Sequence, residues 1–355
     1  MLLATLLALQ IAPVASEIRS APCSRCRFRL DTVAVVGDSA GPGELVWELQ
    51  VFRDAGRRLL VVHRGAPSSV AVFDSTGRFL RTIGRPGAGP GEFRRIWNIL
   101  PFAGGIVVTD DQLRRWTRFD RDLRFVSSHA MPLVPRTAVL DSTGAGVVVA
   151  VVPTSERVGY FRHLVGSGGE LGPSVGDDRM PYREDLHEYL VPDISPATAS
   201  GFYWLSKRRE YQISRCSTRT HDCHRYIRRD SWLPAPRLDD APDENAMLLA
   251  PAPRIRAVSD IGDDLLAVVG WIPDPQWQEG LRRLSPSLAR IEDFNRHFDT
   301  RLDLVDSRSM RVVSSYRFDM AIWGALGDGL FWFHSFDPDG RSRVIVVRPR
   351  LSTNH

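Results

Sequence analysis

The sequence predicts an all-β protein, a six-bladed β-propeller whose blades are four-stranded antiparallel sheets. One segment, residues 70–93, has the pattern of two strands joined by a hairpin turn and followed by a connection rich in glycine and proline. That connection has an earlier copy at residues 36–45, so the chain contains a repeat. A predicted strand near the N-terminus has no blade of its own, and the C-terminal segment has the pattern to complete one.

The hairpin in this segment follows from residue alternation and turn chemistry. Apolar residues alternate with small or polar ones at 70–73 and 79–83, the periodicity of strands with one buried face. Between these strands, Asp74 can accept local backbone hydrogen bonds and Gly77 can supply the positive φ of a tight turn. Residues 84–93 contain too much glycine and proline for a strand or a helix. We therefore expect them to connect two structural units.

The connection at residues 83–93 (IGRPGAGPGEF) matches residues 36–45 (VGDSAGPGEL), which are one residue shorter. Pro42 and Pro90 are 48 positions apart, a spacing that the neighbouring Gly and Glu share. A repeat of that length, built from about four short strands, is typical of a propeller blade.

At these positions the chain resembles the NHL-repeat propellers. Their repeat runs from an apolar strand through an Asp-x-x-Gly turn and Phe-Leu-x-x-Ile-Gly to Gly-x-Gly-Pro-Gly-x-Phe. The matching residues are Phe73, Asp74, Gly77, Phe79, Leu80, Ile83, Gly84, Gly89, Pro90, Gly91, Glu92 and Phe93. The match covers residues 33–100, and the whole chain is similar to secreted bacterial six-bladed propellers with degenerate NHL-like blades.

The N-terminal strand predicts how the ring closes. Residues 28–36 are similar to the strand at 79–83 and also lead into the repeated connection, so we expect them to form an outermost strand. The C-terminal residues 329–347 would supply the inner part of the same blade, because pairing the two termini removes an open sheet edge. The other five blades are predicted at residues 45–83, 96–130, 136–174, 190–229 and 255–318.

An insertion at about residues 275–297 interrupts the fifth predicted blade. From Trp277 onward, apolar residues recur at three- and four-residue spacing, which predicts an amphipathic helix. They are Leu281, Leu284, Leu288, Ile291 and Phe294. Ser285 and Pro286 have the character of a cap and a first helical residue, so we expect two short helices. We expect the insertion to cover one propeller face, as a buttress rather than a substrate lid.

The N-terminal residues 1–16 are predicted to be a signal peptide, and residues 17–355 the propeller. Residues 2–15 form an apolar run too short to cross a bilayer, and small residues precede a cut after Ser16. No later segment is apolar enough to cross a membrane. We therefore expect an exported monomer, periplasmic or extracellular, that is not an integral membrane protein.

The charge pattern argues against a nucleic-acid partner. The net charge is +4, and Lys207 is the only lysine among 46 cationic residues. The arginine clusters stand among Asp and Glu rather than forming a basic stripe. The hydrophobic fraction of 43% suffices for a large core.

The four cysteines predict two local disulfides, because disulfides are the default state after export. Cys216 and Cys223 flank a polar turn in a hairpin pattern, and Cys23 and Cys26 are three positions apart, so each pair closes a short loop. Two alternatives remain: a four-cysteine zinc site, which needs distant segments to meet, and a thioredoxin-like role for Cys23, which lacks the fold that activates such a thiol.

Residues 37–42 (GDSAGP) look like a serine-protease signature and also fit Gly-x-Ser-x-Gly. We interpret them as an inter-blade connection, because the same connection recurs at 84–91 and no histidine precedes them. We predict no catalytic and no cofactor-binding residue.

Histidines and paired aspartates give no assignable metal site. His221 and His224 bracket Cys223, but on a strand they would point differently. Other histidines stand alone in strand patterns and are interpreted as structural: His63, His163 and His334. Aspartate pairs fall at predicted turns, where Asp is first a turn former: residues 110–111, 177–178, 239–240 and 263–264. Related gluconolactonase- and paraoxonase-type propellers hold calcium at the channel mouth, so calcium stays an option.

Two functions follow from this fold. The first is an exported, non-catalytic binding propeller that recognises a protein, peptide or glycan through its channel face. The alternative is a calcium-dependent lactonase or esterase, or a related propeller lyase, in which a channel-bound metal polarises a carbonyl. Three or more carboxylates converging in the channel would favour the alternative.

Overall fold

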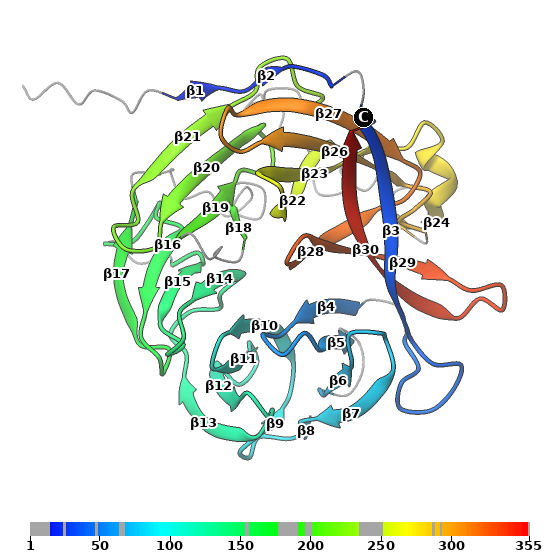
Figure 1. Ribbon diagram of the computed structural model, residues 1–355. Coiled ribbons are helices and arrows are strands. Elements are labelled where there is room, and N and C mark those ends of the chain that lie inside the picture. The colour runs from blue at the N-terminus through cyan, green and yellow to red at the C-terminus, as the bar shows by residue number, and fades with distance from the viewer. Residues whose placement is uncertain are drawn as a thin grey trace, which may run out of the picture.

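The strands form six antiparallel sheets arranged as blades around a central axis in this computed structural model (Figure 1). The predicted six-bladed β-propeller is therefore confirmed. The structure describes residues 15–23, 26–46, 49–63, 68–152, 156–176, 191–195, 201–233, 251–285, 288–291 and 293–353.

The six blades follow one another along the chain, and their innermost strands surround the axis (Figure 1). Blade one comprises β4 (Leu49–Arg53), β5 (Leu59–His63), β6 (Val70–Phe73) and β7 (Phe79–Ile83). Blade two comprises β10 (Ile96–Phe102), β11 (Gly105–Asp110), β12 (Arg115–Asp120) and β13 (Phe125–Ala130). Blade three comprises β14 (Thr137–Leu140), β15 (Gly146–Val149), β16 (Arg162–Val165) and β17 (Leu171–Val175).

Blades four to six form the second half of the ring, and the longest strands belong to blades five and six. Blade four comprises β18 (Asp193–Ile194), β19 (Phe202–Ser206), β20 (Gln212–Ser217) and β21 (Cys223–Ile227). Blade five comprises β22 (Arg254–Gly262), β23 (Leu265–Pro273), β26 (Phe298–Asp306) and β27 (Arg311–Phe318). Blade six comprises β28 (Ile322–Gly327), β29 (Leu330–Phe336), β30 (Ser342–Thr353) and β3 (Cys26–Val36).

The ring closes between the two termini, as the sequence predicts. β3 pairs antiparallel with β30 along its whole length, from Cys26 opposite Thr353 to Val36 opposite Val344. Figure 1 shows the blue and red strands side by side. The inward side chains of Ala34 and Val36 are buried in a cluster shared by blades six and one. The closing strand therefore both covers a sheet edge and fills core volume.

The repeated connection has the same backbone structure in both copies. β8 (Arg85–Pro86) pairs parallel with β9 (Glu92–Phe93), and Asp38 makes the same kind of parallel bridge with Glu44. Glu44 N–H donates to Gly41 O at 3.0 Å, and Glu92 N–H to Gly89 O at 3.1 Å. The protease-like signature is thus part of an inter-blade connection.

The core lies between adjacent blades. In one cluster, Leu60 and Val72 of blade one pack with Ile106 and Val108 of blade two, and all four are fully buried. Because each blade is covered on both faces, β6 is buried at every position, whereas alternation predicts one buried face. Burial on both faces explains why the central strands contain continuous apolar runs.

The predicted helical insertion is wrong. The segment contains one short 3-10 turn, η2 (Trp277–Gly280), followed by a hairpin of β24 (Leu281–Ser285) and β25 (Leu288–Ile291). The hairpin register places Leu281 opposite Ile291. A helix would bring together residues three and four positions apart, and the hairpin pairs residues up to ten apart, but a short apolar run does not discriminate the two.

A short N-terminal segment crosses the rim of two blades. β1 (Ser16–Glu17) pairs parallel with β21 of blade four, and β2 (Arg19–Ser20) pairs parallel with β27 of blade five (Figure 1). Between them, Ile18 is buried in the core that these blades share. Residues 1–14 of the predicted signal peptide lie outside the described residues, and the peptide stays a prediction. No helix among the described residues is long and apolar enough to span a membrane.

Candidate functional site

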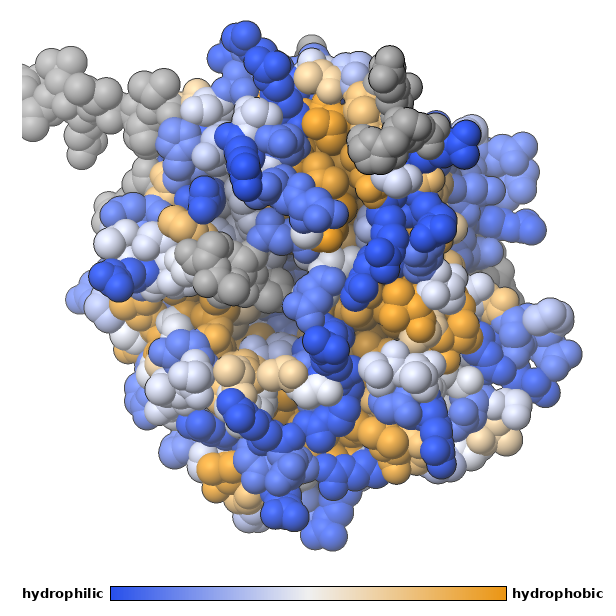
Figure 2. Space-filling model, viewed as in Figure 1, coloured by the Kyte–Doolittle hydropathy of each residue, from blue (hydrophilic) through white to orange (hydrophobic). Residues whose placement is uncertain are grey.

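The strand order defines which side chains share an end of the propeller. Within each blade, neighbouring strands run in opposite directions. The side of the inter-blade connections therefore carries the starts of the first and third strands and the ends of the second and fourth. We call this side the connection face. In blade five it carries Arg254 at the start of β22, Asp274 after β23 and Asp299 near the start of β26. Seen along the axis, the molecular surface is mainly hydrophilic, with separate hydrophobic patches (Figure 2).

Four arginines gather at the connection face of blades three to five. Arg254 and Arg256 lie on innermost strand β22, and the other two stand directly before innermost strand β14 and shortly after β19: Arg136 and Arg208. A backbone hydrogen bond from Ile255 N–H to Arg208 O, at 2.9 Å, fixes β22 beside blade four. We call these four residues the arginine cluster.

One carboxylate, Asp193, pairs within this cluster. Its oxygens accept hydrogen bonds from Arg208 Nε at 2.8 Å and Nη2 at 2.9 Å, a bidentate pair that is partly buried. Burial alone would raise the pKa of Asp193, but the positive charges of Arg208 and Arg256 lower it below its usual value. Asp193 is therefore ionised and already engaged by Arg208.

Arg256 has no carboxylate partner of its own in the part of the chain that the structure describes. Its Nη2 donates to Trp323 O at 3.1 Å, and its guanidinium lies 4.3 Å from the ring centre of Trp271. Its Nε is buried and has no hydrogen-bond acceptor among the described residues. Burial, together with the charges of Arg208 and Arg254, lowers the pKa of Arg256 to about 9. Among the described residues, the carboxylate of the cluster pairs with Arg208 and forms no hydrogen bond with Arg256.

Aromatic rings of blades five and six support this cluster. The Arg254 guanidinium lies 4.9 Å from the Trp271 ring and 5.0 Å from the Phe298 ring. Trp271 packs edge-on against Trp323 at 5.1 Å, and its Nε1 donates to Ile322 O at 2.6 Å. These contacts fix the orientation of the Arg254 and Arg256 guanidinium groups, because arginine stacks favourably on aromatic faces.

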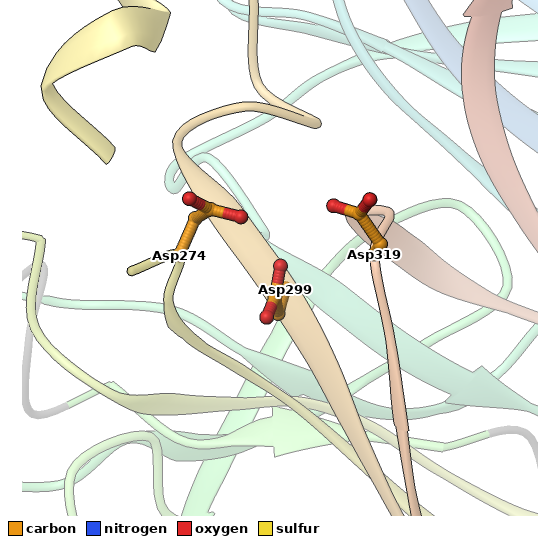
Figure 3. Close-up of side chains that lie close together, drawn as sticks. All are labelled: Asp274, Asp299 and Asp319. Atoms are coloured by element: carbon orange, nitrogen blue, oxygen red, sulfur yellow. The ribbon is translucent and has the colours of Figure 1, made fainter. Parts of the chain in front are cut away.

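A group of three carboxylates, Asp274, Asp299 and Asp319, lies farther out on blade five (Figure 3). One oxygen of each is within 4.8 Å of the others. They belong to the ends of the second, third and fourth strands. Figure 3 shows the side chains of Asp274 and Asp319 on either side of Asp299. Asp299 is 3% exposed, and burial raises its pKa to about 6 against the opposing effect of Arg317, with Asp274 raising it further.

These carboxylates fit a hard cation only in part. Carboxylate oxygens are suitable ligands for calcium, and Asp299 Oδ1 is buried without a hydrogen-bond partner among the described residues. However, Arg317 forms an ion pair with Asp299 Oδ2, and Gln276 N–H donates to Asp274 Oδ1 at 2.5 Å. The group also stands outside the ring of innermost strands. The hydrolase hypothesis requires three or more carboxylates that converge in the channel, and these three do not lie there.

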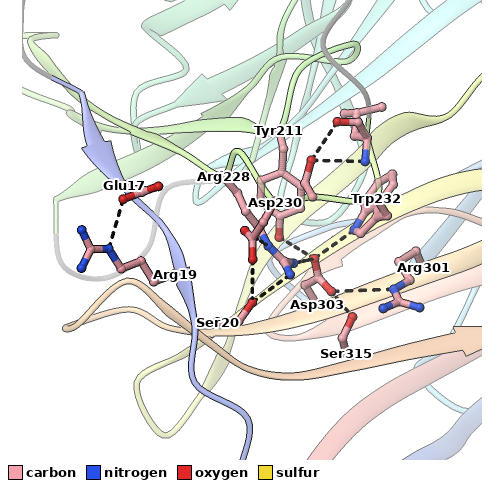
Figure 4. Close-up of polar contacts among 12 residues, drawn as sticks. Glu17, Arg19, Ser20, Tyr211, Arg228, Asp230, Trp232, Arg301, Asp303 and Ser315 are labelled. Carbon is pink, nitrogen blue, oxygen red and sulfur yellow. Dashed lines mark hydrogen bonds and ion pairs between the residues drawn. The ribbon is translucent and has the colours of Figure 1, made fainter.

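A second buried carboxylate, Asp303, is fully satisfied by its neighbours (Figure 4). Its Oδ2 accepts from Tyr211 Oη at 2.8 Å, Arg228 Nη1 at 2.6 Å and Trp232 Nε1 at 2.9 Å, and its Oδ1 from Ser315. Burial and the Asp303 charge raise the pKa of Tyr211 well above its usual value. Because every partner is in place, this network joins blades four and five rather than offering a binding site.

The four cysteines form two separate local pairs. The structure joins Cys23 to Cys26 and Cys216 to Cys223, with Cα atoms 5.5 Å and 4.1 Å apart. The second pair bridges directly opposite residues of β20 and β21. A single four-cysteine zinc site is incompatible with this pairing.

The histidines singled out from the sequence contact different neighbours. His163 Nδ1 lies 2.9 Å from Ser174 Oγ, His334 contacts Ser342, and His224 Nε2 lies 2.8 Å from Ser16 Oγ. His221 stands in a turn with a φ of 62°, and His63 ends β5.

The aspartate pairs that the structure describes act in turns. Asp110 accepts hydrogen bonds from the backbone N–H groups of Arg94, Arg95 and Leu113. Asp263 and Asp264 have positive φ in the turn between β22 and β23. The pairs at 177–178 and 239–240 lie outside the described residues.

Sequence reasoning missed the arginine cluster. Arg254 and Arg256 are two positions apart on β22, and both guanidinium groups lie over the Trp271 ring although the pairing register shifts between Ile255 and Ala257. The spacing of these two arginines was the signal in the sequence that could have indicated the cluster. Arg208, however, stands in a run of charged residues that is typical of a solvent-exposed segment. Only the ring arrangement brings three distant segments together.

Comparison with known proteins supports the fold. The DUF5128 family model, described as a 6-bladed beta-propeller, matches residues 45–144. A search of curated proteins finds no match.

Two solved structures have the same fold at low sequence identity, and a third is more distant. A member of the DUF4221 family from Bacteroides vulgatus is 8% identical with a TM-score of 0.63, covering 93% of this chain and 99% of its own. A candidate exported protein from Bacteroides fragilis is 12% identical with a TM-score of 0.59, covering 95% and 99%. A streptogramin B lyase is 12% identical over 92% and 97%, with a TM-score of 0.44. The likeness to the two Bacteroides structures shows the fold alone and no activity, and the lyase, with a TM-score under 0.5, supports no argument.

Proposed function

We propose that this protein is an exported, non-catalytic binding propeller that takes a protein, peptide or glycan at the connection face. The observation that carries the proposal is Arg256, a partly buried guanidinium held by Trp271 and Trp323 without a carboxylate partner among the described residues. A charge kept in such surroundings costs free energy unless a ligand completes its contacts.

The chemistry of the cluster favours binding over catalysis. Guanidinium groups and indoles orient and hold anionic or aromatic groups, and an arginine seldom exchanges its proton near neutral pH. The acid at this site, Asp193, is ionised and occupied by Arg208. The cluster therefore has the character of a recognition surface.

The alternative is a calcium-dependent lactonase or esterase, or a propeller lyase. The observation in its favour is the group formed by Asp274, Asp299 and Asp319, which would supply the oxygen ligands. Calcium bound there would polarise a substrate carbonyl. The Arg317 ion pair at Asp299 weakens this alternative, because it already neutralises the most buried of the three carboxylates.

Glycan and peptide arrays probed with the purified protein test the proposal. We expect a ligand whose binding is lost in Arg256→Gln and retained in Asp299→Asn. Binding that is lost in Asp299→Asn but kept in Arg256→Gln would contradict the assignment to the arginine cluster. Hydrolysis of lactones or esters that requires added calcium and disappears in Asp299→Asn would establish the alternative instead.

Two observations support export. Paired cysteines are stable in oxidising compartments, and one structure of the same fold is named a candidate exported protein. Fractionation of the native cells tests this, with the protein expected in the periplasm or the medium and shortened at its N-terminus.

A further inference from the structure

We propose that the ligand presents an oxyanion, a carboxylate or a phosphate, to Arg256 within the arginine cluster. This inference rests on the proposed function, because it names the chemistry that a ligand at the connection face must have. It concerns the innermost strands of blades three to five, and not the carboxylate group on the outer strands.

The charges of the described residues lead to this chemistry. Both carboxylate oxygens of Asp193 accept hydrogen bonds from Arg208, so this carboxylate is already paired with that arginine. Arg256 feels the charges of Arg208, Arg254 and Arg136, and those charges act against its own. An oxyanion beside Arg256 would offset this repulsion, and its approach would be steered by the same positive field.

The Arg256 guanidinium is held ready for a ligand. Its Nη2 is fixed by the Trp323 carbonyl, and the Trp271 ring fixes its plane. Arg256 keeps part of its surface exposed, although its Nε is buried. A guanidinium whose orientation is set before binding loses little conformational freedom when it forms paired hydrogen bonds to a carboxylate or phosphate.

Two donors at this position lack acceptors. Arg256 Nε and Trp323 Nε1 are buried and make no hydrogen bond among the described residues. Buried donors without acceptors are uncommon in folded proteins, and sites where they gather are places where a ligand or water is expected. Trp323 also accepts from Arg256 Nη2 through its carbonyl, so the two residues are direct neighbours.

Tryptophan fluorescence provides a direct test, because Trp271 and Trp323 both contact Arg256. The protein is titrated with inorganic phosphate and, separately, with malonate, and sodium chloride at matched ionic strength serves as the reference. We expect a saturable change with at least one of the two anions. The anion that binds more tightly identifies the ligand group as phosphate or carboxylate.

Two variants locate the site. Arg256→Gln removes the charge and is expected to weaken anion binding by roughly tenfold or more, since charge-assisted pairs are the strong ones. Arg308→Gln is the matched control, because Arg308 is exposed on the opposite face, in the turn after β26, where it pairs with Asp264. Its affinity should equal that of the wild type. Arg256→Lys, which keeps the charge without the planar fork, guards against misfolding and is expected to bind with intermediate affinity.

The outcomes separate this inference from the proposed function. No saturable change with either anion, or equal affinities in the wild type and Arg256→Gln, would overturn the oxyanion assignment. If the arrays still yield a ligand that depends on Arg256, the binding function stands and its ligand lacks an oxyanion. If neither the arrays nor the anions show binding, both proposals fail.

Discussion

Arg228 Nη1 lies 2.6 Å from Asp303 Oδ2, and this ion pair joins the connection after blade four to the third strand of blade five. Asp303 is fully buried, and the Arg228 side chain is 9% exposed. Arg228 also donates to Ser20 Oγ at 3.1 Å, so the pair holds the N-terminal segment against the rim (Figure 4). Interruption of this contact should therefore affect the stability of the whole domain.

Asp303→Ala is expected to lower the free energy of unfolding by about 3–5 kcal/mol, because it removes the buried counter-charge of Arg228 and leaves only the exposed Asp230 beside it. Urea denaturation followed by fluorescence measures the change. Asp230→Ala is the matched control, since Asp230 pairs with the same arginine but its side chain is 63% exposed. The control should lose no more than about 1 kcal/mol. Equal losses in the two variants would contradict the role given to Asp303.

The second prediction concerns β3, the strand that closes the ring. Ala34→Asp places a carboxylate between β3 and the buried core of blades six and one, and we expect it to abolish or severely weaken cooperative unfolding. Val35→Asp alters the next residue of the same strand, whose side chain is 49% exposed, and should melt close to the wild type. Thermal unfolding by circular dichroism compares them. Closure by β3 would be wrong if both variants retained the wild-type melting temperature.

The cysteine pairing is checked by mass spectrometry. Alkylation of the denatured, unreduced protein should modify no cysteine, and reduction beforehand should expose all four. Replacing both Cys216 and Cys223 by serine should lower stability by about 2–3 kcal/mol, because the bridge restricts the unfolded chain. Modification of any cysteine without reductant would contradict the two-disulfide assignment.

The pH dependence of stability should report on His334. Burial lowers the pKa of His334 to about 4, so the unfolded chain takes up its proton first as the pH falls. Stability from this residue is therefore present above about pH 6.5 and is lost as the pH falls towards 4, by up to about 3 kcal/mol. His334→Gln should have a shallower decline over this interval. The exposed His224→Gln should follow the wild type, and a wild-type slope in both variants would exclude this contribution.

Local chemistry predicts most of the fold. Gly41 and Gly89 occupy equivalent places in two copies of one connection, and this spacing alone indicates the blade length and the unpaired strand at residues 28–36. The cysteine pairs are equally local. The hairpin at 281–291 was missed because its apolar spacing also suits a helix. The arginine cluster was missed because Arg136, Arg208 and Arg256 become neighbours only when three blades assemble.

The central claim is that a ligand with an oxyanion binds at Arg256. Nuclear magnetic resonance of the arginine Nε–H groups in ¹⁵N-labelled protein tests it directly, with the Arg256 signal assigned by its absence in Arg256→Gln. The account predicts that phosphate or malonate shifts this signal saturably, while the signal of the exposed Arg308 stays nearly constant. An Arg256 signal that does not move, or that moves only in proportion to Arg308 as salt is added, would contradict it.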